Sequence, residues 1–149
     1  MTTCPPRVPA LSRALAIACV VCWSLLTMTS SAADPGLYEM RVYDAPEGKL
    51  DALHARFREH TMKLFAKHGM ENLIYWKPRD IDDADRKLIY LLGHSSQDAA
   101  KESFAAFRKD PDWLSAKEAS EKKAGGSLTE KDGGVLSEFF VAAEYSPLR

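Results

Sequence analysis

Apolar and polar residues alternate along several segments of the chain, with the period of two that is typical of a strand. Residues 37–43 (LYEMRVY) alternate in this way, so Tyr38, Met40 and Val42 are expected on one face and the residues between them on the other. In residues 70–77 the same count places Asn72 and Trp76 on one face. Further strands are expected over residues 87–94 (KLIYLLGH) and 135–145 (VLSEFFVAAEY).

Between these strands the apolar positions recur every three or four residues, which predicts amphipathic helices. The first covers residues 47–67 and ends at Gly69, a residue that takes positive φ without a Cβ penalty. A second begins at the Ser95–Ser96 cap and continues to Lys109. Asp110 and Pro111 then interrupt the pattern, and Asp110 is expected to cap a further helix that reaches about residue 123.

The order of these elements is β-α-β-β-α-β, which is the ferredoxin-like arrangement. We therefore predict an α+β fold in which helices cover one face of a four-stranded antiparallel sheet. The third and fourth strands are apolar on both faces, so the other face also needs cover. Residues 34–149 supply no second layer, and a second copy, packed sheet against sheet as a dimeric α/β barrel, is the simplest cover.

The N-terminal residues differ in character from this domain. Arg7 and Arg13 precede an uncharged apolar run over residues 14–28, and small residues follow it. This order is typical of a secretory signal peptide. We predict one at residues 1–33 and a single domain at residues 34–149.

Cleavage is expected after Ala32 or Ala33, with export to the periplasm or out of the cell. The apolar run reaches about 22 Å as a helix, short of the hydrocarbon core of about 30 Å. No stable membrane span is therefore expected after cleavage. An uncleaved anchor is the alternative.

The three cysteines, Cys4, Cys19 and Cys22, all lie in this removable segment. The exported domain would then have no thiol, which excludes disulfides, thiolate catalysis and cysteine-bound metals. Cleavage also removes two arginines and changes the formal net charge from −1 to −3. Because no basic field remains, nucleic acid is not an expected partner.

Several stretches of the domain resemble the NIPSNAP family. They are YEMRVYDAPEGKL, RFREHTMKLFAKHGM, YWKP, AFRKDPDW and YSPL, and they extend in order from Tyr38 to Leu148. The resemblance implies a dimeric α+β barrel, related to antibiotic-biosynthesis monooxygenase-like and chlorite-dismutase-like dimers. It implies no defined activity. Animal members are mitochondrial and linked to trafficking and mitophagy signalling, whereas the export signal here indicates an exported bacterial member.

The four histidines have no metal-binding spacing, so neither a metal site nor a cofactor is predicted. His68 is expected to cap the end of the first helix, and His94 to meet solvent at a strand end. His60 is a candidate base or ligand-binding group at the edge of a cleft between sheet and helices. Its alternative role is that of a boundary side chain bonded to backbone, since an imidazole titrates near pH 6.5 in many settings.

Two further motifs supply candidate ligand-binding residues. Trp76, at the end of the second strand, either lines a pocket mouth or anchors a core or interface. In AFRKDPDW, Arg108 could hold an anionic ligand, and Trp113 either covers the cleft or packs on the first helix. Asn72, Trp76 and a helix histidine resemble the set in cofactor-free monooxygenases of this superfold, but their placement does not match it and no catalytic role is assigned.

Three hypotheses follow for function. The first is a dimeric protein that binds a small hydrophobic molecule in an apolar cleft lined by His60, Trp76, Arg108 and Trp113. The second is a cofactor-independent monooxygenase or isomerase with His60 as its base. The third is a protein-interaction module without a ligand, which would be preferred if the cleft were filled by the protein's own side chains.

Overall fold

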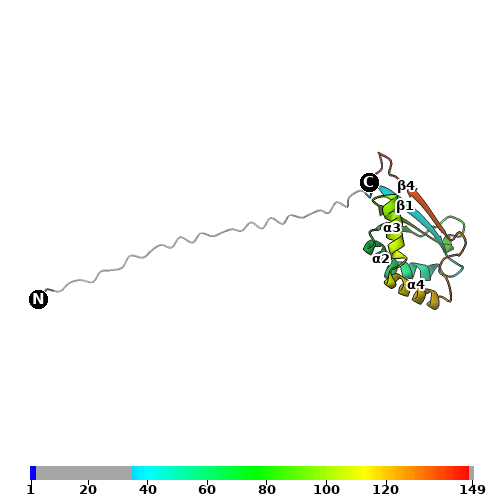
Figure 1. The fold of residues 1–149 in the computed structure, drawn as a ribbon, viewed down its shortest axis with the longest axis horizontal. Coiled ribbons are helices and arrows are strands. Elements are labelled where there is room, and N and C mark those ends of the chain that lie inside the picture. Colours follow the sequence, from blue (N-terminus) through cyan, green and yellow to red (C-terminus); the bar gives the residue numbers. More distant parts are fainter. Residues whose placement is uncertain (3–34, 148–149) are drawn as a thin grey trace. The chain divides into compact units, whose positions relative to one another are not determined.

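The computed structural model describes residues 1–2 and 35–147. The chain divides into two units, Met1–Ala32 and Ala33–Arg149, and the second contains the folded elements of Figure 1. Apart from its first two residues, the predicted signal peptide lies outside the described residues. Within the described part of the chain, no helix has the length and apolar character needed to cross a membrane.

Four strands form one antiparallel sheet in the order β2-β3-β1-β4, which is the ferredoxin-like arrangement. The prediction of an α+β fold with a four-stranded antiparallel sheet is confirmed. The strands are β1 (Leu37–Asp44), β2 (Glu71–Trp76), β3 (Lys87–His94) and β4 (Val135–Phe140). The helices are α1 (Leu50–Arg56), the π-helix η1 (Phe57–Thr61), α2 (Met62–Lys67), the short 3₁₀ helix η2 (Ala84–Arg86), α3 (Gln97–Phe107) and α4 (Pro111–Lys123).

The first helical segment begins at Leu50, later than the predicted residue 47. Gly48 has a φ of 72°, and the Lys49 N–H donates to the Pro46 carbonyl at 3.0 Å, so a turn precedes the helix. The segment then passes from α1 through the π-helix η1 into α2. Gly69, with a φ of 76°, ends it as predicted.

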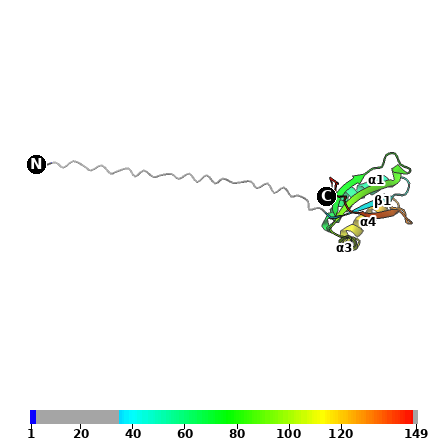
Figure 2. The same cartoon turned by 90° about the horizontal axis from the view of Figure 1, so that it is seen from above.

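The helices pack on one face of the sheet, where the core is rich in aromatic rings (Figures 1 and 2). Tyr90 of β3 is fully buried there, and its ring centroid lies 5.2 Å from that of Phe57 and 6.0 Å from that of Phe65. Such aromatic pairs contribute about 0.5–1.5 kcal/mol each beyond the burial of their area. We call this side the helix-facing side.

Two strand predictions need correction. A β-bulge between Asn72 and Ile74 shifts the register against β3, so Asn72 lies on the helix-facing side while Trp76 lies on the opposite side. Simple alternation had put both on one face, because a single extra residue reverses the faces beyond it. Strand β4 ends at Phe140 rather than at 145, and its last pair with β1 joins Phe140 to Tyr38, the second residue of β1.

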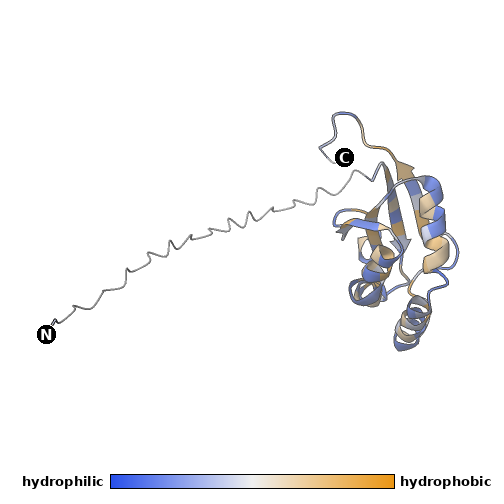
Figure 3. Ribbon diagram, turned by 60° about the vertical axis from the view of Figure 1, so that its left-hand side comes forward, coloured by the Kyte–Doolittle hydropathy of each residue, from blue (hydrophilic) through white to orange (hydrophobic). Residues whose placement is uncertain are grey.

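The opposite side of the sheet, which we call the open face, carries large apolar residues without cover in a single chain. Figure 3 shows hydrophobic residues along the strands. Trp76 is 40% exposed and Leu136 is 52% exposed. Other exposed apolar residues that the register places on this face or directly after it are Ile74, Phe140 and Val141.

Candidate functional site

Two adjoining hollows lie between the helix-facing side of the sheet and helices η1, α3 and α4, and together we call them the cleft. The outer hollow has a volume of about 290 Å³ and the inner hollow about 170 Å³. Four residues line both: Tyr43, Phe107, Trp113 and Lys117. The outer hollow is completed by Arg41, Phe104, Arg108 and Leu114. The inner hollow is completed by Arg56, Phe57, Thr61, Phe65, Glu121, Ser127, Thr129 and Val135.

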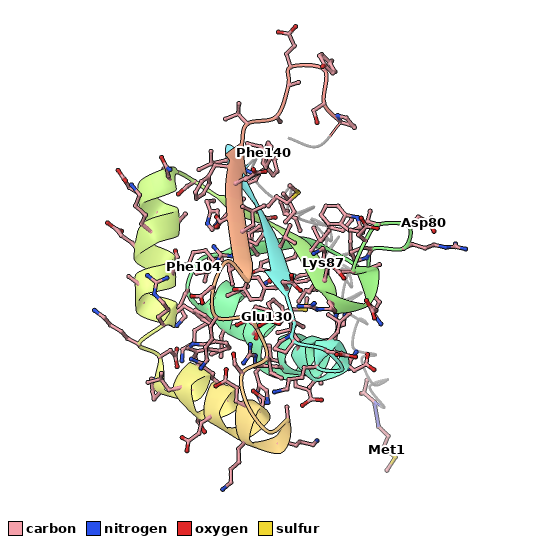
Figure 4. All side chains as sticks on the ribbon, turned by 90° about the vertical axis from the view of Figure 1, so that its right-hand side faces the viewer. Met1, Asp80, Lys87, Phe104, Glu130 and Phe140 are labelled. Atoms are coloured by element: carbon pink, nitrogen blue, oxygen red, sulfur yellow. The ribbon has the colours of Figure 1, made fainter. Side chains whose placement is uncertain are left out.

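Strand β1 brings Arg41 into the outer hollow by simple alternation, because Arg41 and Tyr43 share the helix-facing side. The Arg41 guanidinium carbon lies 4.4 Å from the centroid of the Phe104 ring, a cation–π distance. Figure 4 shows Phe104 between α3 and the sheet. The Arg41 Nη1 donates to Glu39 at 2.5 Å, while its Nε is buried and has no hydrogen-bond partner among the described residues. Burial opposes the positive charge, but the surrounding groups, Glu39 included, raise the pKa of Arg41.

Glu39 lies next to Arg41 and is hydrogen-bonded to side chains from three strands, β1, β3 and β4. His94 of β3 donates to one carboxylate oxygen at 2.9 Å, and Ser137 of β4 donates to the other at 2.5 Å. Burial acts to raise the pKa of Glu39, yet these hydrogen bonds and Arg41 lower it overall, so the carboxylate stays charged. The network therefore fixes Arg41 from β1, β3 and β4 together.

The prediction that His94 meets solvent is wrong. His94 is 2% exposed and lies beside the rings of Phe104 and Phe139, at centroid distances of 6.2 and 6.4 Å. A buried imidazole needs a hydrogen-bond partner, and Glu39 supplies it.

Arg56 ends α1 directly before the π-helix and forms part of the inner hollow. Its side chain is 4% exposed, its Nη1 lies 3.4 Å from Glu121, and its guanidinium carbon lies 5.2 Å from the Trp113 ring. The Arg56 Nε is buried without a hydrogen-bond partner among the described residues. Burial lowers the pKa of Arg56, although Glu121 opposes the shift. Single π-turns within helices occur often at functional sites, and this one faces the cleft.

Two tyrosines of neighbouring strands, Tyr75 of β2 and Tyr90 of β3, lie on the helix-facing side of the sheet. Burial raises the pKa of both Tyr75 and Tyr90, so both are neutral. The Tyr75 hydroxyl donates to Asn72 at 2.5 Å, and Asn72 donates to the Met62 carbonyl at 2.9 Å. The Tyr90 hydroxyl is buried with no partner of normal hydrogen-bond geometry in the described part of the chain. Asn72 thus ties β2 to the helix and has a structural role.

Asp110 holds the corner between α3 and α4, which carries two cleft residues. Its Oδ1 accepts from the Asp112 N–H at 2.8 Å, so the predicted N-cap of α4 is confirmed. Its Oδ2 accepts from His68 at 2.7 Å and from Lys67 at 2.8 Å. These bonds, with Lys67 the largest contributor, hold the pKa of Asp110 well below its usual range. His68 takes the predicted C-cap position of α2, and its side chain also braces α2 against α4.

A model of the NIPSNAP family matches residues 38–147. The chain belongs to the NIPSNAP family. None of the curated proteins compared matches it. Among the solved structures, the domain is similar to a NIPSNAP family protein with unknown function from Agrobacterium tumefaciens str. C58, with 22% identity, a TM-score of 0.62, and coverage of 76% of this chain and 93% of that one.

Two further NIPSNAP structures show the same fold. A second A. tumefaciens str. C58 protein has 19% identity and a TM-score of 0.62, with coverage of 76% of this chain and 98% of the other. An uncharacterized NIPSNAP-like domain protein from Burkholderia xenovorans has 14% identity and a TM-score of 0.60, with coverage of 74% and 88%. At these identities the similarity shows the fold alone.

The four candidate residues do not share one cleft in this NIPSNAP domain. Arg108 and Trp113 both line the outer hollow. His60 lines another hollow of about 480 Å³ between α1 and α4, which borders the inner hollow at Arg56. Its side chain there is 48% exposed and lies 4.0 Å from Glu59. Trp76 lies on the open face. Trp113 packs on Phe107 of α3, with ring centroids 4.4 Å apart, and also meets Arg56 at the end of the first helix.

Sequence reasoning missed the basic residues that the NIPSNAP fold brings to the cleft from β1, α1 and α4: Arg41, Arg56 and Lys117. For Arg41, alternation gave its position on the same face as Tyr43, but it did not indicate which face the helices cover. No local pattern marks Arg56, whose partners Trp113 and Glu121 are far along the chain. Among the described residues no group of three or more metal-ligating side chains comes together.

Proposed function

We propose that this NIPSNAP protein binds a small molecule in the cleft and does so as a homodimer. The observation that supports binding is the unfilled outer hollow of about 290 Å³, lined by rings of Tyr43, Phe104, Phe107 and Trp113. Ligand sites are typically concave and mostly apolar, with a few polar groups that orient the ligand. Arg41 and Arg56 supply such groups, each with a buried Nε that lacks a partner in the described part of the chain.

Ligand-observed NMR on the full chain with a library of small aromatic molecules tests binding. Trp113→Leu is expected to weaken binding because it removes a wall of both hollows, whereas Trp76→Leu on the open face is expected to leave it unchanged. If no library member binds, or if the two variants behave alike, the proposal is wrong.

The open face supports the homodimer. Exposed apolar areas of this kind mark interaction sites, and a two-fold axis lets one patch cover its own copy. Leu136→Glu is expected to yield a monomer in sedimentation equilibrium, because a carboxylate would be buried without a partner in the interface. Ile81→Glu, a matched change at an exposed residue in the loop between β2 and η2, is the control. A wild-type protein that stays monomeric at micromolar concentrations would contradict the dimer.

Export of the domain remains part of the proposal. It rests on the basic, apolar and small-residue order of residues 1–33. Expression in a bacterial host followed by intact-mass measurement of the periplasmic fraction is expected to give a chain that begins after Ala32 or Ala33. A full-length chain retained in the membrane fraction would instead indicate an uncleaved anchor.

The two alternatives have less support. An oxygenase or isomerase with His60 as base needs His60 beside the ligand, but His60 lines a different hollow from Arg108 and Trp113. A comparison of wild type with His60→Ala in a haem and quinone binding screen tests it, and equal behaviour removes His60 from any mechanism. A module without ligand is disfavoured because the cleft retains open volume.

A further inference from the structure

The outer hollow of the cleft has an uneven charge distribution. Three of its lining residues are basic, namely Arg41, Arg108 and Lys117, and none of its lining residues is acidic. Arg41 is neutralised by Glu39 directly behind it. Among the described residues, no carboxylate lies within ion-pair distance, 4.0 Å, of Arg108 or Lys117 (Figure 4 shows the stretch of α3 and α4 from which they come). Arg108 and Lys117 therefore give the outer hollow two positive charges without an ion-pair partner.

The positions of these two residues suit an anion at the mouth. Arg108 follows α3 and Lys117 lies on α4, and both are exposed, whereas Arg41 is buried deeper against Phe104. Exposed charges beside a low-dielectric hollow concentrate ligands of opposite sign at its entrance. An arginine is also well shaped for a carboxylate, because its guanidinium presents donors in a planar fork.

Aromatic rings make up most of the remaining wall. Phe107 and Trp113 lie 4.4 Å apart with 35° between their planes, and Phe104 contacts both Phe107 and the Arg41 guanidinium. Flat rings gain from offset or edge-to-face contacts with such a wall. The volume of about 290 Å³ is at the lower end of the range for small-molecule sites, which limits the ligand to one or two rings.

We propose that the ligand is an aromatic carboxylate of one or two rings. Its ring lies among Phe104, Phe107 and Trp113, and its carboxylate lies at the mouth of the hollow, beside Arg108 and Lys117. This inference rests on the proposed function, because it names the class of molecule that the cleft binds. The aromatic wall recognises the ring, and the two basic residues distinguish an anion from a neutral molecule of the same shape.

Isothermal titration calorimetry on the full chain with three probes of similar size tests this inference. The probes are 2-naphthoate, its neutral amide 2-naphthamide and the saturated decalin-2-carboxylate. We expect 2-naphthoate to bind roughly tenfold tighter than either of the others, and we expect its affinity to fall in high salt. Equal affinity of the acid and the amide overturns the anionic part, and equal affinity of the two acids overturns the aromatic part.

Matched variants connect the preference to the two residues. Arg108→Gln and Lys117→Gln are each expected to weaken 2-naphthoate binding roughly three- to fivefold and to leave 2-naphthamide unchanged, as for exposed charge contacts. Lys109→Gln and Lys122→Gln, at exposed positions that do not line the hollow, are the controls. All four positions are exposed, so the variants are expected to fold.

The outcomes separate the inference from the proposed function. If the preference for the acid survives in the Arg108→Gln/Lys117→Gln double variant, the charges do not recognise the ligand and the inference is wrong. If only neutral or aliphatic molecules bind and Trp113→Leu abolishes their binding, the inference also fails, but the proposed function stands. If no probe and no library molecule binds, both fail.

Discussion

The two faces of the sheet carry similar apolar residues but differ in what covers them. On the helix-facing side, Leu88, Tyr90 and Leu92 of β3 are fully buried. On the open face, Trp76 and Leu136 are 40% and 52% exposed in one chain. The two sides of the sheet thus place similar apolar residues in different surroundings, because neighbouring side chains of a strand point to opposite faces.

The cover on the helix-facing side is itself uneven, and this explains where the cleft forms. The first helical segment contributes Leu53, Phe57, Leu64 and Phe65 to the core. Helix α4 buries only Ala116 and reaches the core chiefly through Trp113. Because α4 packs against α1 and η1 rather than against the sheet, it leaves space between its first turns and β1. One side of the sheet therefore has a ligand-sized gap, and the other side has no helix over it, only the segment after β4 beside Tyr38 and Met40.

The largest effect is expected from Glu39→Ala, which breaks the polar network of the covered face. The change leaves Arg41 without its counter-charge and removes the partners of His94 and Ser137, so the free energy of unfolding should fall by roughly 3–5 kcal/mol. Urea denaturation measures it. Glu102→Ala, at an exposed position on α3, is the control and should change stability by less than about 0.5 kcal/mol. Equal effects would show that the network has no structural role.

A second change examines the uncovered face. If a second copy covers Trp76, Trp76→Ala should cost roughly 2 kcal/mol at high protein concentration, where the dimer forms, and much less in dilute solution. Thermal unfolding measured across a hundredfold range of concentration shows the difference. A loss of stability that does not depend on concentration would mean that Trp76 makes its contacts within one chain. The open face would then not be covered by a second copy.

The fold could be predicted from sequence because its signals are local. Alternation in residues 37–43 placed Tyr38 and Met40 opposite Arg41 and Tyr43, as the register of β1 shows. Glycine and aspartate marked the ends of helices, and Gly69 and Asp110 occupy those positions. Such signals depend on backbone geometry over a few residues, so distant parts of the chain do not alter them.

The candidate site was only partly predictable because its contacts join distant segments. His94 was expected in solvent, but its partner Glu39 lies 55 residues away and no local pattern connects them. The bulge in β2 reversed the face of Asn72 relative to Trp76, since alternation has no means to detect an extra residue. AFRKDPDW did give two cleft residues, because Arg108 and Trp113 flank the helix break that positions them.

A smaller, pH-dependent effect concerns how α4 is held over the covered face. The pKa of Asp110 is lowered by Lys67 and His68. Since its folded-state pKa lies below its unfolded value near 3.8, its contribution is fully present above about pH 4 and is lost as the pH falls towards the folded value. Asp110→Asn should therefore be less stable than wild type at pH 7, with the difference shrinking below about pH 4.

The control for this prediction is Asp112→Asn. Asp112 also pairs with Lys67, at 3.1 Å, but its side chain is 72% exposed, so its replacement is expected to change stability little. Unfolding followed by tryptophan fluorescence between pH 3 and 7 gives both curves. A constant difference between wild type and Asp110→Asn over this range would mean that the carboxylate charge does not hold the corner.

The smallest effect separates two tyrosines that stack in the covered face, with ring centroids 5.3 Å apart. The Tyr90 hydroxyl is buried and interacts with the Tyr43 side chain without a hydrogen bond of normal geometry. The Tyr75 hydroxyl, in contrast, donates to Asn72. Removing an unsatisfied polar group relieves a desolvation cost, and removing a bonded one loses a contact. Tyr90→Phe should therefore be neutral or stabilise by up to about 1 kcal/mol, and Tyr75→Phe should destabilise by about 1 kcal/mol. Loss of stability in both would show that the Tyr90 hydroxyl has a stabilising partner, for which the Tyr43 side chain is the candidate.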